Sequence, residues 1–402
     1  MDIFERISKN KGPIGKYQSI LEGEFAFPKF KGKVSNRVSF NNKDIINWSY
    51  NNYLGFANSD EVKKIDTYAD SKWGITYPMG SRMMTGDTYL HDRFERNIAA
   101  FLKMESALIL NFGYQGMLSV IDCLLSSNDV VITDEQCHAC TIDGTRLHKG
   151  KRLIFKHNNI ESLDDKLKEA TKIISKTNGG ILVVTEGVFS MSGVKGKLKE
   201  ICALKNIYNF RLLVDDAHGF GVVGEKGNGS VCEVNLENQV DLYFTTFTKS
   251  MASFGAVIVG KKDVINYFKY NLRSQIFSKS LPMSIVYGLN ERLKLIIQSN
   301  EKRKKLFKIN KLLQNGLRDM ELISEKLNTC ITPIYFNIDL NNVLKLQQEL
   351  VYSWGIYCSV IIYPVVPKGV VIFRLTSTSL HSKNDVEHTL QSFEKVFKRY
   401  IK

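Results

Sequence analysis

One lysine of this chain lies in a loop rich in hydroxyl side chains, and such a setting suits a nucleophilic amine. Lys249 follows Thr246 and Thr248, and runs typical of strands flank the loop at 241–246 and 256–259. A dry pocket lowers the pKa of a lysine ammonium group and frees the amine to attack an aldehyde. The two threonine hydroxyls could hold a phosphate beside it. The stretch predicts a lysine that forms a Schiff base, with a plain surface lysine as the alternative.

A second pattern stands 34 residues upstream (249 − 215). An apolar run ends in Asp215 and Asp216, and His218 comes three residues after the first acid. A strand that ends in Asp at the carboxyl edge of a sheet places its carboxylate where α/β proteins bind ligands. A carboxylate that faces a pyridine nitrogen keeps that nitrogen protonated, as pyridoxal phosphate chemistry requires. A solvated acidic loop is the alternative for this run alone, but the two patterns together are much more specific.

Taken together, these motifs resemble those of the α-oxoamine synthases, which share the aspartate-aminotransferase fold (fold type I) of pyridoxal-phosphate enzymes. The resemblance runs from Asn51 to Arg374 and is strongest to bacterial serine palmitoyltransferases and relatives that use cysteate. It implies an α/β fold: a large domain with a mostly parallel seven-stranded sheet covered by helices, then a smaller α+β C-terminal domain. We expect an N-terminal arm and strand pair at 1–55, the large cofactor-binding domain at 56–285 and the small domain at 286–402.

The resemblance also implies catalytic roles. Lys249 would bind pyridoxal 5'-phosphate and take the Cα proton of the substrate, while Asp215 would keep the ring nitrogen protonated. His138 would stack over the ring, and His218 and Ser190 would contact its phenolic oxygen. The remaining cofactor contacts would come from a strand–turn–helix phosphate site, the hydroxyl loop and the partner subunit: Gly113, Tyr114, Thr246, Thr248 and Ser278.

Four further residues would bind the amino-acid substrate. Arg374 follows a Pro-x-x-Pro segment, and its guanidinium group suits a bidentate contact with the substrate carboxylate. Asn51, Asn52 and Ser81 would lie near the same substrate. Without the family context, Arg374 reads equally as a surface arginine at the end of a strand.

The reaction implied is condensation of a small amino acid with an acyl thioester, with loss of carbon dioxide. Serine or cysteate and a long-chain acyl group on coenzyme A or acyl carrier protein are favoured, giving a 3-keto sphingoid or sulfonolipid-type precursor. The alternatives are a family branch that accepts glycine or alanine, such as 2-amino-3-ketobutyrate or 8-amino-7-oxononanoate types, an aminotransferase or aldolase of the same fold, and an inactive binding subunit. Pro78 and Met79 replace family glycines, and with Met83 and Met84 they suit an acyl chain, unless these methionines fill core.

The resemblance also implies a homodimer, in which two segments cross to the partner subunit. The loop at 77–86 would enter the neighbouring subunit's active site, and Ser278 would reach the partner's cofactor phosphate. Residues 1–35 read as a helix followed by an extended arm, which would pack on the partner subunit or touch a membrane.

Composition and charge limit the partners and the cellular compartment that can be expected. The 402 residues carry a net charge of +14, which suits anionic substrates or lipid, but the basic residues are scattered and no nucleic-acid motif appears. The seven cysteines show no disulfide framework, and neither a signal peptide nor a membrane-length apolar run is found. These features predict a cytoplasmic protein, either free or at the inner face of the membrane. Cys137-x-x-Cys140 has no second ligand pair, so no metal or redox site is expected.

Hydrophobic periodicity predicts the elements that position these residues. Fully apolar runs such as 181–184 alternate with helical patterns such as 90–102, which favours a parallel sheet covered on both faces. A strand pair is expected at 34–40 and 45–50, and one long helix, straight or bent, at 284–317. The small domain is expected to combine strands at 331–337, 357–363 and 370–375 with helices at 341–354 and 384–400.

Overall fold

The computed structural model describes residues 2–10 and 12–400. The chain divides into two compact units. The large unit holds residues 59–190 and 194–303, and the small unit holds residues 1–58, 191–193 and 304–402. The three-part division expected from the sequence stays a prediction.

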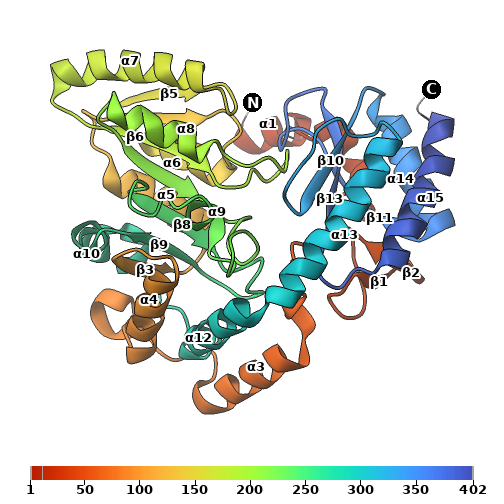
Figure 1. Cartoon of the computed structure of the whole chain (residues 1–402), viewed down its shortest axis with the longest axis horizontal. Helices are drawn as coiled ribbons and strands as arrows, with labels where there is room; N and C mark the ends of the chain where they lie inside the picture. The colour runs from red at the N-terminus through yellow and green to blue at the C-terminus, as the bar shows by residue number, and fades with distance from the viewer. Residues whose placement is uncertain (1, 11, 401–402) are drawn as a thin grey trace. The chain divides into compact units, whose positions relative to one another are not determined.

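A seven-stranded sheet is the centre of the large unit (Figure 1). Strand β9 is antiparallel to both of its neighbours, and all other neighbours are parallel. The predicted fold class, a mostly parallel sheet of seven strands, is therefore confirmed. In spatial order the strands are β3 (Ser106–Leu110), β9 (Ala256–Gly260), β8 (Leu242–Thr246), β7 (Arg211–Asp215), β6 (Ile181–Glu186), β4 (Val130–Asp134) and β5 (Lys151–Phe155).

Helices cover both faces of this sheet, which explains why its central strands are buried along nearly all of their length. On one face, Val131, Val184 and Leu213 share a buried cluster with Met117 of α5 and Phe268 of α10. Helix α7 packs against β4, β5 and β6. The helices of the large unit are α3 (Asp60–Trp73), α4 (Tyr89–Phe101), α5 (Gly113–Leu124), α6 (Ala139–Leu147), α7 (Ile160–Thr177), α8 (Leu198–Ala203), α9 (Gly229–Glu233), α10 (Lys262–Asn271), α11 (Arg273–Ile276) and α12 (Met283–Gln298).

Four neighbouring strands, β4, β6, β7 and β8, run parallel and end at one edge of the sheet. Their last residues are Asp134, Glu186, Asp215 and Thr246. Three acids and a hydroxyl therefore meet at the carboxyl edge, where α/β proteins bind ligands.

The small unit packs helices against a three-stranded antiparallel sheet. Strand β13 (Val371–Thr376) lies between β10 (Ile331–Phe336) and β12 (Ser359–Ile361). Helices α13 (Asn300–Asp319), α14 (Leu340–Trp354) and α15 (Lys383–Tyr400) share a buried cluster with this sheet, centred on Leu313, Leu346, Phe373 and Phe393. A second sheet contains β1 (Arg37–Phe40), β2 (Lys43–Asn47) and β11 (Ile356–Tyr357).

Two elements that the sequence predicted as continuous are each divided into two in the structure. The strand expected at 357–363 is two short strands in different sheets, because β11 pairs with β2 whereas β12 pairs with β13. The helix expected at 284–317 is α12 followed by α13, with Ser299 outside both. The Ser299 hydroxyl donates to the carbonyl of Leu295 at 2.6 Å, a local bond of the kind that competes with helix continuation.

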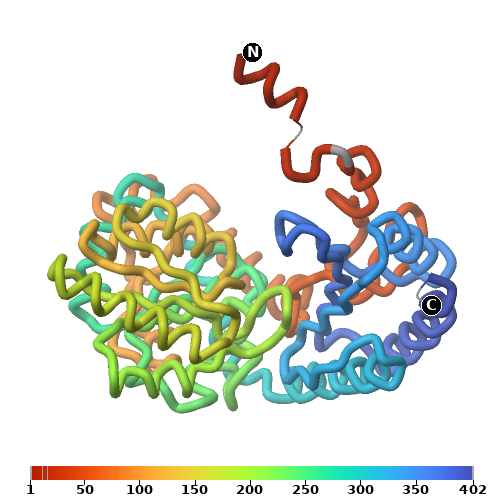
Figure 2. Tube along the Cα trace, turned by 90° about the horizontal axis from the view of Figure 1, so that it is seen from above, coloured from red at the N-terminus to blue at the C-terminus, as the bar shows by residue number. Residues whose placement is uncertain are grey.

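The N-terminal arm begins with helix α1 (Ile3–Asn10), which buries no residue. Ile3, Phe4 and Ile7 are all exposed, Phe4 by 82%. Figure 2 shows α1 at the end of the red N-terminal trace. Among the described residues, no helix is long and apolar enough to cross a membrane.

Candidate active site

The hydroxyl loop places Lys249 against His218. The lysine Nζ lies 2.7 Å from Nε2 of the histidine. Lys249 is half-buried in the connection from β8 to β9, and buried His218 follows β7, the neighbouring strand. The parallel pairing of β7 and β8 thus brings together two residues that the sequence separates by 31 positions.

Asp215 faces the same group. It is the last residue of β7, is 5% exposed and accepts a hydrogen bond from the Ala217 N–H at 3.1 Å. Burial raises the pKa of this carboxyl group, while the charges of Lys249 and His138 lower it. The structure therefore brings Asp215, His138, His218 and Lys249 into one electrostatic cluster.

His138 is held by the start of α6. It is the N-cap residue, and its Nδ1 accepts the N–H of Cys140 at 3.2 Å. Since Nδ1 accepts, the neutral ring carries its proton on Nε2. The His138 ring is exposed. The Tyr114 ring lies edge-on to it, with 6.2 Å between the two ring centroids. An exposed ring over the carboxyl edge is free to stack on a planar ligand.

The phosphate-binding residues predicted from the sequence also converge. A Cβ on Gly113, the first residue of α5, would lie 3.2 Å from Thr246 Oγ1, and that hydroxyl lies 3.1 Å from Thr248 Oγ1. Thr246 also donates to the carbonyl of Gly255 at 3.1 Å. Free N–H groups at the start of a helix beside two hydroxyls form a suitable cradle for phosphate. Tyr114 is the next residue of α5 and donates to Asp143.

Three serines of the predicted set lie on loops of the large unit. Ser190 is 8% exposed and lies in the loop after β6, the neighbour of β7. Ser81 and Ser278 are half-buried. Their two segments are hydrogen-bonded to each other, since the Ser280 N–H donates to Gly80 at 3.0 Å and the Met283 N–H donates to Tyr77 at 2.9 Å.

The small unit holds Arg374 and its contacts. The buried guanidinium of Arg374 donates to Asn51 Oδ1 at 3.2 Å and to Thr376 Oγ1 at 3.0 Å. Burial lowers its pKa, whereas Tyr53 raises it. Asn52 instead accepts the N–H of Ala57 at 3.1 Å within a turn. Asn51, rather than Asn52, therefore contacts the arginine.

The buried acid Glu186 was absent from the predicted site. Its Oε1 accepts the N–H of His138 at 2.5 Å, and it stands opposite Asp215 in the pairing of β6 with β7. Glu186 closely follows an apolar run as Asp215 does, but it lacks the histidine three residues later that completes the pattern of Asp215 and His218.

Cys137 and Cys140 are both buried, and burial raises the pKa of each thiol. Cys137 donates to the carbonyl of Val184, and Cys140 lies 3.0 Å from the His138 ring. Across residues 2–10 and 12–400 no group of side chains could hold a metal ion. High thiol pKa values leave both cysteines poor nucleophiles.

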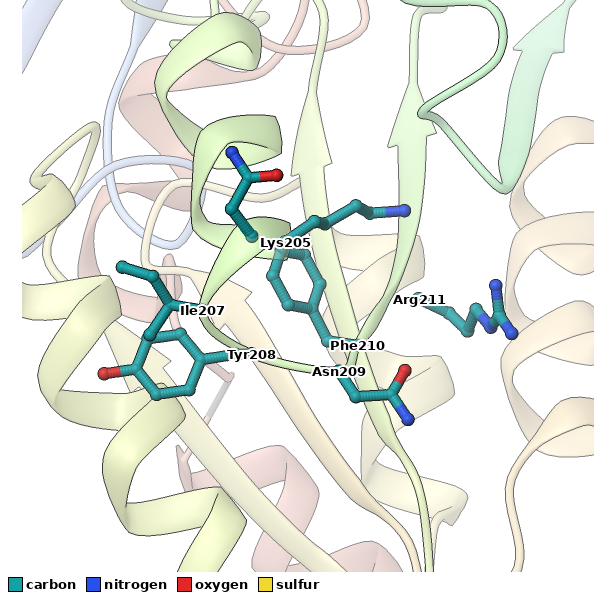
Figure 3. A pocket seen from close by; sticks show the side chains of 7 residues that line it. Lys205, Ile207, Tyr208, Asn209, Phe210 and Arg211 are labelled. Atoms are coloured by element: carbon teal, nitrogen blue, oxygen red, sulfur yellow. The ribbon is translucent and has the colours of Figure 1, made fainter.

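One pocket, of about 390 Å³, is lined by none of these residues, and Figure 3 shows the side chains that line it. It is lined by residues 205–211, and Arg211 is the first residue of β7. It therefore lies at the amino end of the strand that carries Asp215 at its carboxyl end. Because parallel sheets bind ligands at carboxyl ends, this pocket is not the candidate active site.

Comparison with known proteins agrees with this geometry. The pattern of the family "Aminotransferase class I and II" matches residues 43–393. A cysteate-C-fatty acyltransferase of Capnocytophaga ochracea is 46% identical over 98% of this chain and 94% of its own. An 8-amino-7-oxononanoate synthase of Thermosipho melanesiensis is 36% identical over 89% of each chain. The solved serine palmitoyltransferase of Sphingomonas wittichii superposes with a TM-score of 0.91 at 28% identity, covering 100% of this chain and 99% of its own. The chain therefore belongs to the class I and II aminotransferase family and, within it, to the α-oxoamine synthases.

Proposed function

We propose that the protein is an acyltransferase that condenses cysteate or serine with a long-chain acyl thioester and releases carbon dioxide. The observation that carries this proposal is the 46% identity to a cysteate-C-fatty acyltransferase over nearly the full length of both chains. The 8-amino-7-oxononanoate synthases are less similar, at 36% or below. The product would be a 3-keto precursor of a sulfonolipid or a sphingoid base.

Pyridoxal phosphate fits the residues at the carboxyl edge. The start of α5 and the hydroxyls of Thr246 and Thr248 offer donors to its phosphate, and Asp215 offers a carboxylate to its ring nitrogen. Ser190, and Ser278 of a second copy, would complete the set. When bound, this cofactor draws electrons away from the Cα atom of an amino acid.

Each side chain of the proposed site has a separate role. Lys249 would bear the amine that holds the cofactor and, once the amino group of the substrate has displaced that amine, would accept the substrate Cα proton at Nζ. His218, 2.7 Å away, holds that amine in place. Asp215 would keep a proton on the ring nitrogen, and His138 would cover the ring. Arg374 offers its guanidinium fork to the substrate carboxylate.

We also propose a homodimer. The loop and turn that carry Ser81 and Ser278 expose large apolar side chains: Met79 is 76% exposed, Met84 78% and Phe277 73%. Exposed apolar residues on two hydrogen-bonded segments favour burial against a second copy. Light scattering should show a dimer at assay concentration, and a fully active monomer would contradict this part of the proposal.

The compartment proposed is the cytoplasm. All seven cysteines are free, and six of them are buried. Free buried thiols are typical of a reducing compartment.

A substrate panel tests the function. Serine, cysteate, glycine and alanine are each combined with short and long acyl chains on coenzyme A and on acyl carrier protein, with products identified by mass. We expect product only with a thioester present, and the fastest turnover with cysteate or serine and palmitoyl donors. Fast turnover with glycine or alanine and short chains would place the protein in another branch. Amino-acid turnover without any thioester would indicate an aminotransferase or a lyase.

A further inference from the structure

The carboxyl edge of the large sheet carries three buried acids on neighbouring strands: Asp134, Glu186 and Asp215. Asp134 accepts hydrogen bonds from the His157 Nδ1–H, the Asn158 N–H and the Gln136 N–H, each at 2.9 Å, so it holds the loop after β5 and the start of the loop that leads to α6. Only Asp215 has a role in the proposed chemistry, so the purpose of Glu186 is open.

Glu186 connects two members of the proposed active site. Its side chain is almost fully buried, and Oε1 accepts the backbone N–H of His138 at 2.5 Å. It is the register partner of Asp215, and register partners in parallel strands point to the same face of a sheet. Glu186 therefore lies beside the carboxylate of Asp215 and anchors the residue that begins α6.

The charges around Glu186 decide its protonation state. Asp215 on β7 and Asp134 on β4 disfavour a second negative charge, as does burial, while Lys249 and the His138 N–H favour one. Cys137 and Cys140 are the other titratable groups that sense its charge. Burial and Asp215 are the leading influences, and they raise the pKa of Glu186 well above its ordinary value. Two buried carboxyl groups side by side do not both ionise readily.

We propose that Glu186 is a positioning residue of the active site, which fixes His138 through its backbone N–H while carrying a proton. Asp215 then remains the single carboxylate charge directed at the cofactor ring. This inference rests on the ring-facing roles proposed for His138 and Asp215. Glutamine has the shape of a protonated glutamate and keeps its acceptor oxygen, but it cannot ionise. Glu186→Gln therefore tests whether residue 186 carries a charge, whereas Glu186→Ala tests the hydrogen bond to His138.

The test uses Glu186→Gln, Glu186→Ala and Asp216→Asn in the full-length protein. Hydrogen exchange of the cofactor-free protein reports the anchor: exchange in the segment that contains His138 should rise in Glu186→Ala and stay near wild type in Glu186→Gln. In the holoenzyme, kcat should stay close to wild type in Glu186→Gln and fall at least about tenfold in Glu186→Ala, since small misplacement of a catalytic group is costly. Asp216→Asn, the matched control at the same sheet edge, changes an acid that is bonded to Ser230 and Tyr243 and should leave exchange at His138 unchanged.

Titration of the cofactor absorbance reports the charge. The apparent pKa of the Lys249-bound cofactor should be the same in wild type and Glu186→Gln. A shift of about one unit or more would mean that Glu186 is ionised and would overturn its protonated role. Unchanged exchange and turnover in Glu186→Ala would overturn the anchor. A wild-type protein that binds pyridoxal phosphate but fails the substrate panel would refute the proposed function alone, because exchange and titration need no substrate.

Discussion

Asp215 and Asp216 are consecutive in the chain, yet they face different surroundings. Asp216 accepts three hydrogen bonds from neutral donors: the Ser230 N–H at 2.6 Å, the Ser230 hydroxyl at 2.7 Å and the Tyr243 hydroxyl at 2.8 Å. Asp215 accepts the Ala217 N–H and faces the charges of Lys249 and His138. Successive side chains of an extended segment point to opposite faces of the sheet. Asp215 and Asp216 therefore enter different environments although they are neighbours in the chain.

The backbone also packs tightly around the side chain of Asp216. A Cβ on Gly187 or Gly219 would lie 2.0 or 2.1 Å from its Oδ1, and one on Gly229 would lie 2.3 Å from its Oδ2. Glycine is therefore needed at all three positions to admit the carboxylate. Burial raises the pKa of both aspartates, so burial alone does not mark the one that we propose for the active site. The type of partner distinguishes the two aspartates. Neutral hydrogen-bond donors indicate a structural acid, and nearby cations indicate an acid available to a ligand.

The largest expected effect comes from removing the cation that Asp215 faces. Lys249→Ala should abolish covalent attachment of pyridoxal phosphate and turnover, because the Schiff base needs this amine. The fold should survive, since the side chain is only half-buried. Borohydride reduction followed by peptide mapping checks the attachment, with Lys261→Ala as a control that keeps it. Label on another lysine of the wild-type protein would refute the assignment.

Asp215→Asn should be the next most severe change. The shape is kept but the negative charge beside the ring nitrogen is lost, so kcat should fall at least about 100-fold. Thermal stability should change little by comparison. Asp216→Asn is the matched control one residue away, and it should keep most of the activity. Equal activity of the two variants would contradict the division of roles between the two acids.

Much of this site could be predicted from the sequence, because its motifs are local. Strand-Asp-x-x-His and hydroxyl-x-hydroxyl-Lys each fit within a few residues, and each lies at the end of an apolar strand. The strands themselves were recognisable because burial on both faces of a sheet favours continuous apolar runs, such as 130–132 and 181–184.

The remainder depends on tertiary context. Glu186 carries no motif, and its contact with His138 joins residues 48 positions apart through strand pairing. The split of 357–363 could not be read from periodicity either, because β11 and β12 are chosen by partners in two different sheets. Which of Asp215 and Asp216 faces the ligand required the family resemblance, since both follow the same apolar run.

A smaller effect is expected on stability from Asp216→Ala. The N–H of Ser230 and the hydroxyls of Ser230 and Tyr243 would lose a buried acceptor. Leaving buried donors unsatisfied should lower the free energy of unfolding by about 2–3 kcal/mol. Denaturant unfolding measures this loss, and the folded fraction should still bind the cofactor. Stability equal to that of wild type would show that these hydrogen bonds contribute little.

The smallest effect concerns pH. Burial raises the pKa of Asp216 from 3.8 to about 6 in the folded protein. A carboxyl group whose pKa is raised on folding contributes stability that is fully present below its unfolded pKa and is lost as the pH rises through the folded pKa. Wild type should therefore lose about 1 kcal/mol relative to Asp216→Asn between roughly pH 5 and 7.5, because the amide cannot ionise. Unfolding free energies of both proteins across this window provide the measurement. A difference between them that does not vary with pH would mean that Asp216 ionises as in the unfolded chain, and that its three neutral donors offset the cost of burying its charge.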